Sequence, residues 1–352
     1  MPHRRTTFSK FIIESLRRTE RDPELAALLN DVMTACKLIS VAVSRGATEP
    51  VRPAGLGAPA EPKALDQLAS EIMLNVCEFG GQLCGMVSEE LAEPYPIPEG
   101  FPRGRYMLLF DALDGASNID VNMPVGTVFS VLRAEEGVAD PMPADFLQPG
   151  AKQVAAGYAL HGPVSMLVVT LGDGTHGFTL EREIGAYVLT HPRMAIQEAT
   201  REFAIDASNA RFWEPPVRRY VEECTEGLAG PRGADFEMRW IASMVAEVHR
   251  ILIRGGLFIH PRDRRDEVGR AGLVYVANPL AMLVEQAGGA ASTGRRRIVD
   301  IPPDALHQHV PVIVGSRGEV ERIVEYHAAY DRGEPVAFVS PLFNTRSLFR
   351  TG

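Results

Sequence analysis

The sequence has little lysine and no excess of positive charge. Its 36 basic residues are almost all arginine, and its 45 acidic residues give a formal net charge of −9. The only lysines are Lys10, Lys37, Lys63 and Lys152. This balance argues against a nucleic-acid-binding protein, which usually presents a basic surface. An acidic protein that handles an anionic substrate must gather positive charge locally, as bound metal or as clustered arginine.

Cysteine and long apolar segments are also scarce. The four cysteines lack the CxxC spacing of a metal or redox motif, so we expect buried free thiols in a reducing, cytoplasmic environment. No apolar segment follows the N-terminal arginines as it would in a signal peptide, and no uninterrupted apolar run is long enough to cross a bilayer. The sequence therefore predicts neither a nucleic acid nor a membrane as a partner. The cysteines are Cys36, Cys77, Cys84 and Cys224.

The 352 residues are enough for two domains. We expect an N-terminal domain over 1–195, an α/β domain over 196–332 and a weakly ordered tail over 333–352. Apolar periodicity predicts helices over 8–20, 24–45, 63–79, 218–226, 242–254, 279–287 and 319–330. Shorter apolar runs predict strands over 83–87, 106–110, 127–132, 154–160, 165–171, 176–180, 204–205 and 256–259.

Two features mark boundaries between these elements. The segment 46–62 is rich in glycine, proline and alanine, which predicts a loop. Asn278 and Pro279 have the residue types of an N-cap and a first helical position, which predicts that a helix begins there.

The stretch 110–118, FDALDGASN, carries the strongest chemical signal. It follows an apolar run and places Asp111 and Asp114 three residues apart around a glycine turn, while Glu89 and Glu90 close another apolar run. Two carboxylates at such a turn can hold a divalent metal beside a phosphate. Each acid also has a simpler interpretation, as a turn former or a solvated neighbour. Because buried unpaired carboxylates are costly, four of them at two strand ends favour a metal site.

Motifs along nearly the whole chain resemble class I fructose-1,6-bisphosphatase. They occur in the family's order as SEE over 88–90, FDALDGASNIDV over 110–121, GTVFS over 126–130, QPG over 148–150, VAAGY over 154–158, RWIASMVAEVHRI over 239–251, NPLAMLVEQAGG over 278–289 and HQHVPVIVGS over 307–316.

The resemblance implies an α/β protein with the α+β sugar-phosphatase fold, a five-layer α-β-α-β-α sandwich of two domains that usually forms a homotetramer. It implies hydrolysis of the 1-phosphate of fructose 1,6-bisphosphate, in gluconeogenesis or the Calvin cycle, with two or more Mg²⁺ ions at each site. Hard oxygen ligands suit magnesium, and paired metal ions stabilise both the attacking and the leaving oxygen.

The resemblance also implies a role for individual residues. The metal ligands are Glu89, Asp111, Asp114 and the carbonyl oxygen of Leu113. The residues that position and deprotonate the attacking water are Glu90 and Asp66, although a solvated helix face is the simpler interpretation of Asp66. The residues that bind the substrate are Asp114, the 1-phosphate cradle Gly115, Ala116 and Ser117, and the sugar and distal-phosphate residues Asp206, Arg239, His260 and Arg270.

The chain departs from the family pattern mainly on the substrate side. The family's sugar-phosphate lysine is Arg270, its next basic residue is Gly272 and its metal-binding glutamate is Val276. An aromatic hydroxyl is replaced by His260, and an asparagine of the distal-phosphate pocket is replaced by Asp206. Fructose-1,6-bisphosphatase remains the leading hypothesis. The alternatives are a sedoheptulose-1,7-bisphosphatase, a broader sugar phosphatase, and a sugar-phosphate-binding pseudoenzyme with a defective metal site.

Overall fold

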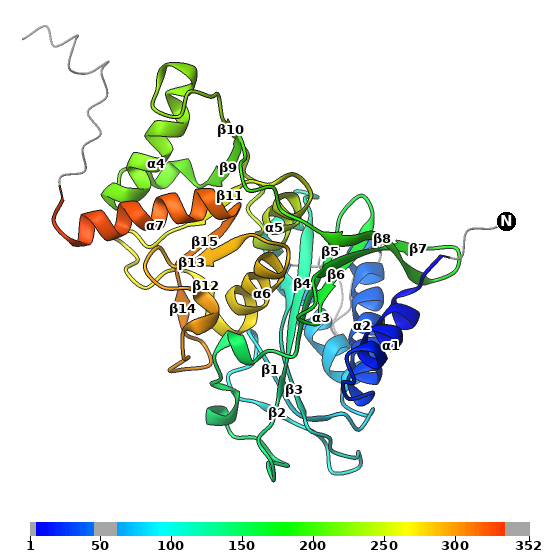
Figure 1. Cartoon of the computed structure of the whole chain (residues 1–352). Coiled ribbons are helices and arrows are strands. Elements are labelled where there is room, and N and C mark those ends of the chain that lie inside the picture. The colour runs from blue at the N-terminus through cyan, green and yellow to red at the C-terminus, as the bar shows by residue number, and fades with distance from the viewer. Residues whose placement is uncertain (1–4, 46–61, 335–352) are drawn as a thin grey trace, which may run out of the picture.

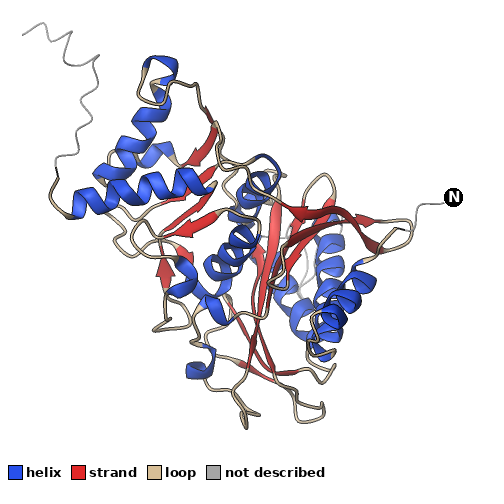
Figure 2. Cartoon of the chain, in the orientation of Figure 1, coloured by secondary structure: helices blue, strands red, loops and turns tan. Residues whose placement is uncertain are grey.

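The structure is a computed structural model in which residues 5–45 and 62–334 are described. The predicted loop over 46–62 and the predicted tail over 333–352 lie almost entirely outside these residues. In the described part, five layers alternate as helices, sheet, helices, sheet and helices, which confirms the predicted five-layer sandwich (Figures 1 and 2). The helices are α1 Phe8–Arg18, α2 Glu24–Arg45, α3 Pro62–Cys77, α4 Pro215–Thr225, α5 Met244–Arg254, α6 Asn278–Gln286 and α7 Arg317–Asp331.

The larger sheet has the strand order β2-β1-β3-β4-β5-β6-β7-β8. Helices α1 to α3 cover one face and helices α5 and α6 cover the other. Strands β1 and β3 are parallel, whereas the pairs from β3 to β8 are antiparallel. The strands are β1 Leu83–Ser88, β2 Tyr95–Pro96, β3 Tyr106–Asp114, β4 Val125–Arg133, β5 Ala155–His161, β6 Ser165–Thr170, β7 Thr175–Glu181 and β8 Ala186–Met194.

The smaller sheet has the order β10-β9-β11-β15-β13 and lies between helices α5 and α6 on one side and helices α4 and α7 on the other. A separate two-stranded sheet, β12-β14, lies beside it. These strands are β9 Glu202–Ile205, β10 Glu237–Met238, β11 Leu257–His260, β12 Ala271–Gly272, β13 Ala290–Ser292, β14 His309–Val310 and β15 Val312–Gly315.

Helix α2 begins and ends where the sequence predicts, at Glu24 and Arg45. By length and composition alone it could also cross a membrane. Half of its apolar window is buried, and its apolar residues pack into the same core as helices α1 and α3. Its length and apolar composition are therefore explained by its position as a core helix. The four cysteines are buried free thiols, as predicted.

The structure corrects two local predictions. Strand β3 does not end at Phe110 but continues to Asp114, with an irregular register between Asp111 and Asp114. Asn278 is not an N-cap, because a π-helical turn, η7 Leu273–Ala277, leads directly into α6 and Asn278 has helical backbone angles. Strand β8 was not predicted; it is an edge strand that contains Pro192 and is only partly buried.

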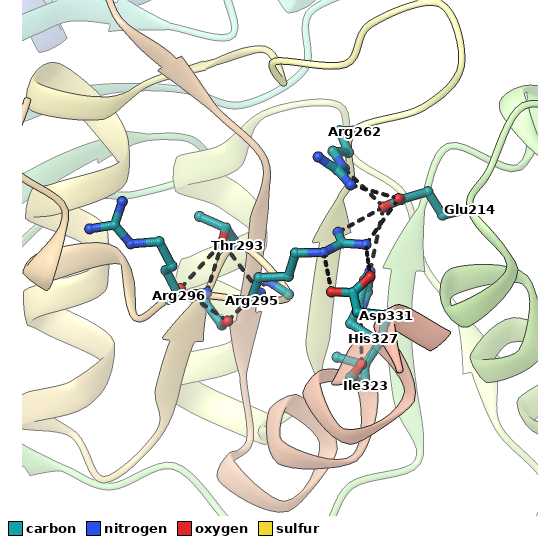
Figure 3. Close-up of polar contacts among 10 residues, drawn as sticks. Glu214, Arg262, Thr293, Arg295, Arg296, Ile323, His327 and Asp331 are labelled. Carbon is teal, nitrogen blue, oxygen red and sulfur yellow. Dashed lines mark hydrogen bonds and ion pairs between the residues drawn. The ribbon is translucent and has the colours of Figure 1, made fainter. Parts of the chain in front are cut away.

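One ion-pair network connects the start of helix α4, two loops and helix α7 in the C-terminal half of the chain (Figure 3). The Glu214 carboxylate, just before α4, accepts hydrogen bonds from Arg262 at 2.9 and 3.1 Å and from Arg295 at 3.2 Å, with His327 of α7 at 3.7 Å. Arg295 also binds Asp331 at 2.7 and 2.8 Å. Burial would raise the pKa of Glu214, but the nearby His327 and the hydrogen bonds from Arg262 and Arg295 hold it well below its usual value.

Candidate active site

A cavity of about 470 Å³ lies between the two sheets at the end of β3. It brings together residues that the sequence singled out from several distant segments. Those residues are Asp66, Glu89, Glu90, Asp111, Leu113, Asp114, Gly115, Ala116, Asp206, His260 and Arg270. Two other predicted site residues do not line this cavity: Ser117 is exposed in the short 3₁₀ turn Ala116–Asn118, and Arg239 points to neighbouring acids.

The parallel pairing of β1 and β3 explains why the two acidic pairs meet. Parallel strands place their carboxyl ends at the same edge of a sheet. Ser88, the last residue of β1, is paired with Phe110, and the Glu89 N–H donates to the Phe110 carbonyl at 3.2 Å. Glu89 and Asp111 therefore follow immediately from paired positions on adjacent strands.

The irregular end of β3 turns its carboxylates toward the cavity. The Leu113 N–H donates to Oδ1 of Asp111 at 3.0 Å, which holds that side chain across the turn. Gly115 follows with φ of 78°, a conformation that favours glycine. A Cβ at Gly115 would also lie 2.8 Å from Cβ of Ser243, so the close approach of the two segments requires glycine there.

Asp114 connects this turn to the first residues of helix α5. Its Oδ2 accepts hydrogen bonds from Oγ of Ser243 at 2.8 Å and from the N–H of Val245 at 3.0 Å. Ser243 is the N-cap of α5, where its Oγ also accepts from the Ala246 N–H. The free N–H groups and the dipole of a helix N-terminus favour anions. A carboxylate and an anionic substrate group can therefore both be stabilised at this end of α5.

Asp66 reaches the cavity from helix α3. Its Oδ1 is buried and has no hydrogen-bond partner among the described residues. Burial, followed by the charge of Glu90, raises the pKa of Asp66 to about 7. Asp66 is thus half-buried at the cavity and not on a fully solvated helix face.

Burial and mutual repulsion dominate the electrostatics of the acids. Burial raises the pKa of Glu89, Asp111 and Asp114; the negative charge of Asp114 raises that of Glu89 further, and the charge of Glu89 raises that of Asp111 further. None of these three forms an ion pair with lysine or arginine within the described residues. Burying three carboxylates together is unfavourable in free energy, and a bound divalent cation would offset this cost.

The donor set fits a hard cation such as Mg²⁺. It consists of the carboxylate oxygens of Glu89, Asp111 and Asp114 and the Leu113 carbonyl, the ligands that magnesium prefers. Over residues 5–45 and 62–334, no three Asp, Glu, His or Cys side chains are already gathered tightly enough to hold a metal ion as they stand. The cluster is thus open, with the ligand types for a metal but not a closed cage.

Val276 lines the same cavity from the π-helical turn η7 and is 4% exposed. Gly272 lies close to the acids as well, since a Cβ there would be 3.9 Å from Oε1 of Glu89. These two departures from the family pattern, Val276 and Gly272, therefore line or adjoin the cavity that holds the acidic cluster. An aliphatic side chain at Val276 supplies no ligand.

The distal end of the cavity contains residues that sequence reasoning did not select. Trp240 stacks on Phe258 with ring centroids 6.0 Å apart, and Phe258 lies 6.0 Å from the ring of His260. Ala242, Ser243 and Met244 also line the cavity. Trp240 and Ser243 belong to the motif over 239–251, but nothing in that motif indicates that α5 begins beside Asp114.

Comparison with known proteins gives a consistent result over the full chain. The family model for the fructose-1,6-bisphosphatase N-terminal domain matches residues 6–192. The family model for the fructose-1,6-bisphosphatase C-terminal domain matches residues 196–328. A "fructose-1,6-bisphosphatase class 1" of Methylacidiphilum infernorum is 55% identical, with 99% of each chain covered. A relative of the same description from Hydrogenophilus thermoluteolus is 52% identical, with 98% of this chain and 97% of the relative covered.

A solved structure has the same fold. The crystal structure of Leishmania major fructose-1,6-bisphosphatase in its holo form superposes with a TM-score of 0.82 at 31% sequence identity, covering 92% of this chain and 99% of that one.

Proposed function

Because the chain belongs to the class 1 fructose-1,6-bisphosphatase family, we propose that it hydrolyses the 1-phosphate of fructose 1,6-bisphosphate to fructose 6-phosphate and inorganic phosphate. The observation that carries the proposal is the convergence of Glu89, Asp111 and Asp114 at one sheet edge, beside the first residues of α5. Acidic ligands for a metal next to a helix N-terminus form a site suited to a phosphate group.

The family generally uses a divalent metal, and the finer assignment here is Mg²⁺ at two or more positions per site. Glu89, Asp111, Asp114 and the Leu113 carbonyl would hold it. When bound, magnesium neutralises phosphate charge and stabilises the attacking and leaving oxygens.

The remaining residues have positioning and proton-transfer roles. Glu90 and Asp66 line the cavity next to the metal-binding acids, where a carboxylate can orient the attacking water and accept its proton. The backbone of the Gly115–Ser117 turn would hold the 1-phosphate with its N–H groups. Arg270 and His260 at the distal end would contact the sugar and its second phosphate.

Wider assignments accompany this function. The chain would work as a homotetramer in the cytoplasm, in gluconeogenesis or the Calvin cycle, with a sugar bisphosphate as its substrate. It would divide into an N-terminal domain over 1–195, which carries the metal-binding acids, and a C-terminal α/β domain over 196–332, which carries the sugar-phosphate pocket.

The decisive experiment measures release of inorganic phosphate from fructose 1,6-bisphosphate with magnesium and with a chelator. We expect turnover only with magnesium. Sedoheptulose 1,7-bisphosphate is tested in parallel, because Asp206 and His260 lie where the distal phosphate would be read. Binding of both bisphosphates without turnover of either would favour the pseudoenzyme, for which the aliphatic Val276 is the supporting observation.

A further inference from the structure

Within its own chain, the distal end of the active-site cavity has little positive charge for a second phosphate. Among the described residues that line the cavity, Arg270 is the only arginine or lysine. Its Nε binds Asp266 at 3.0 Å, and its Nη2 lies 4.0 Å from Asp263. The one cation at this end is therefore already shared between two carboxylates of its own loop.

Asp206 adds a fixed negative charge at the same end. It caps the 3₁₀ turn Ala207–Asn209, and its Oδ1 accepts from the Ser208 N–H at 3.0 Å and from the Ser208 hydroxyl at 2.6 Å. Its Oδ2 accepts from the Asn209 amide at 2.6 Å. These neutral donors hold the carboxylate in place without cancelling its charge, and no arginine or lysine of the described chain forms an ion pair with it.

The other groups at the distal end suit an uncharged sugar better than a phosphate. Burial lowers the pKa of His260, so its ring is neutral at pH 7, and its buried Nδ1 has no partner among the described residues. A neutral ring nitrogen and a carboxylate both accept hydrogen bonds from hydroxyl groups, whereas a phosphate dianion has no proton to donate. The exposed face of Trp240, which is 39% accessible, offers an apolar surface for a sugar ring.

We propose that Asp206 is a specificity-determining residue that weakens selection for a distal phosphate, so that the chain also hydrolyses ketose 1-phosphates whose distal end carries a hydroxyl. This inference rests on the proposed phosphatase function. In the added reaction water attacks phosphorus, the bond from phosphorus to the sugar oxygen breaks, and that oxygen takes a proton. The products are the free ketose and inorganic phosphate.

The test compares kcat/KM for fructose 1,6-bisphosphate and fructose 1-phosphate, which differ only in the distal phosphate. We expect the two values to be within about tenfold of each other in the wild-type protein. Asp206→Asn removes the charge and keeps a capping side chain, so it should raise kcat/KM for the bisphosphate about tenfold, the effect of one unit charge a few ångströms away in a partly exposed site. The value for fructose 1-phosphate should not rise with it, because a distal hydroxyl gains nothing from removal of the charge and loses a carboxylate acceptor.

Two controls separate this effect from folding and from general charge. Asp206→Ser also keeps an N-cap residue type, and it should behave like Asp206→Asn. Glu267→Gln removes one charge from the exposed loop before Arg270, outside the cavity, and should leave the ratio of the two kcat/KM values unchanged. A preference of a thousandfold or more for the bisphosphate, unaltered by either Asp206 variant, would overturn the inference.

A binding measurement keeps the inference testable if turnover fails. The affinity for fructose 6-phosphate, measured by calorimetry, should rise about tenfold in Asp206→Asn. Hydrolysis of neither substrate together with this tighter binding would reject the proposed function and retain the role of Asp206. Unchanged binding of fructose 6-phosphate would reject the role of Asp206, whatever the activity.

Discussion

Ser243 donates a hydrogen bond from its Oγ to Oδ2 of Asp114 at 2.8 Å, across 129 residues of sequence. The bond joins the end of β3, which carries the proposed metal ligands Asp111 and Asp114, to the first turn of α5, which lies between the two sheets. The Val245 N–H donates to the same oxygen. One carboxylate oxygen of Asp114 is thus committed to the helix, and we expect the other to face a metal ion.

Ser243→Ala should impair catalysis more than it impairs folding. It removes one of the two bonds that orient Asp114 and also the N-cap of α5, a change that costs about 1 kcal/mol of stability. We expect kcat to fall about tenfold and the magnesium concentration for half-maximal activity to rise. The control Thr7→Ala removes the N-cap of α1, far from the cavity, and should lower stability without changing kcat. Equal kinetic effects in the two variants would contradict a positioning role for Ser243.

Asp114→Asn should abolish magnesium-dependent turnover and leave the fold intact. The asparagine oxygen can still accept from Ser243 and Val245, while the charge that faces the metal is lost. We expect kcat/KM to fall at least about a thousandfold, the scale of losing a strong electrostatic element, and magnesium binding measured by calorimetry to weaken. Asp300→Asn removes an exposed acid of the second half and serves as the control. Retained activity in Asp114→Asn would refute the metal assignment.

The parts of the site that the sequence predicted are those set by local pattern. Apolar runs indicated β1 and β3, and the residues that follow them indicated the acids, so Glu89 and Asp111 could be expected at one edge. The contact of Asp114 with Ser243 could not, because it depends on how α5 packs between two sheets. The stacking of Trp240 on Phe258 could not be predicted either, because in the sequence each residue looks like an ordinary apolar position.

The fold errors have physical causes as well. Strand β8 is half exposed and interrupted by Pro192, so it lacks the apolar alternation that reveals buried strands. The residue types of Asn278 and Pro279 favour a helix start. Helix α6 does begin at Asn278, as these residue types predict. Only the capping role is wrong, because a π-helical turn of five buried residues leads directly into the helix and leaves no cap position.

Glu214→Gln should destabilise the protein in a pH-dependent way. The folded-state pKa of Glu214 is depressed, since the nearby His327 and the hydrogen bonds from Arg262 and Arg295 outweigh its burial (Figure 3). Its contribution is therefore fully present above the ordinary pKa of about 4.3 and is lost as pH falls below that value toward the folded pKa. We expect a loss of about 2 kcal/mol at pH 7, between the values for exposed and buried pairs.

The measurement for Glu214 is denaturant unfolding of both proteins at pH 7 and near pH 3. The difference between wild type and Glu214→Gln should shrink at the lower pH. Glu334→Gln, which removes an exposed partner of Arg332, is the control and should have little effect at either pH. A difference that stays constant with pH would show that Glu214 contributes through packing and not through its charge.

Arg239 should act in the active site of a neighbouring subunit. Within its own chain it pairs with Glu202 at 3.2 Å and with Glu237, and it does not line the cavity, although Trp240 does. Arg239→Ala should therefore raise KM for fructose 1,6-bisphosphate about tenfold or more with a smaller change in kcat. Mixing this variant with inactive Asp114→Asn should restore some activity, because hybrid oligomers contain sites with both residues intact. No recovery after confirmed subunit exchange would place Arg239 outside a shared site.

Val276→Glu should strengthen magnesium binding. The side chain lines the cavity beside the acids, and neighbouring Gly272 leaves space next to Glu89. A carboxylate at this position would add an anion to a cluster that must offset the charge of magnesium. We expect a lower magnesium concentration for half-maximal activity and a kcat increase of about ten- to a hundredfold. A magnesium titration of phosphate release for both proteins measures the change.

Val276→Gln separates charge from volume in this comparison, because glutamine has the size of glutamate without its charge. Both variants place a polar group in a site that is 4% exposed, so both should melt at a lower temperature without magnesium. Only Val276→Glu should recover its melting temperature when magnesium is added, since only a carboxylate is paired by the bound ion. The contrary outcome is an unchanged magnesium requirement and no recovery of the melting temperature in Val276→Glu. It would show that the other acids already complete the metal site and that Val276 does not weaken magnesium binding.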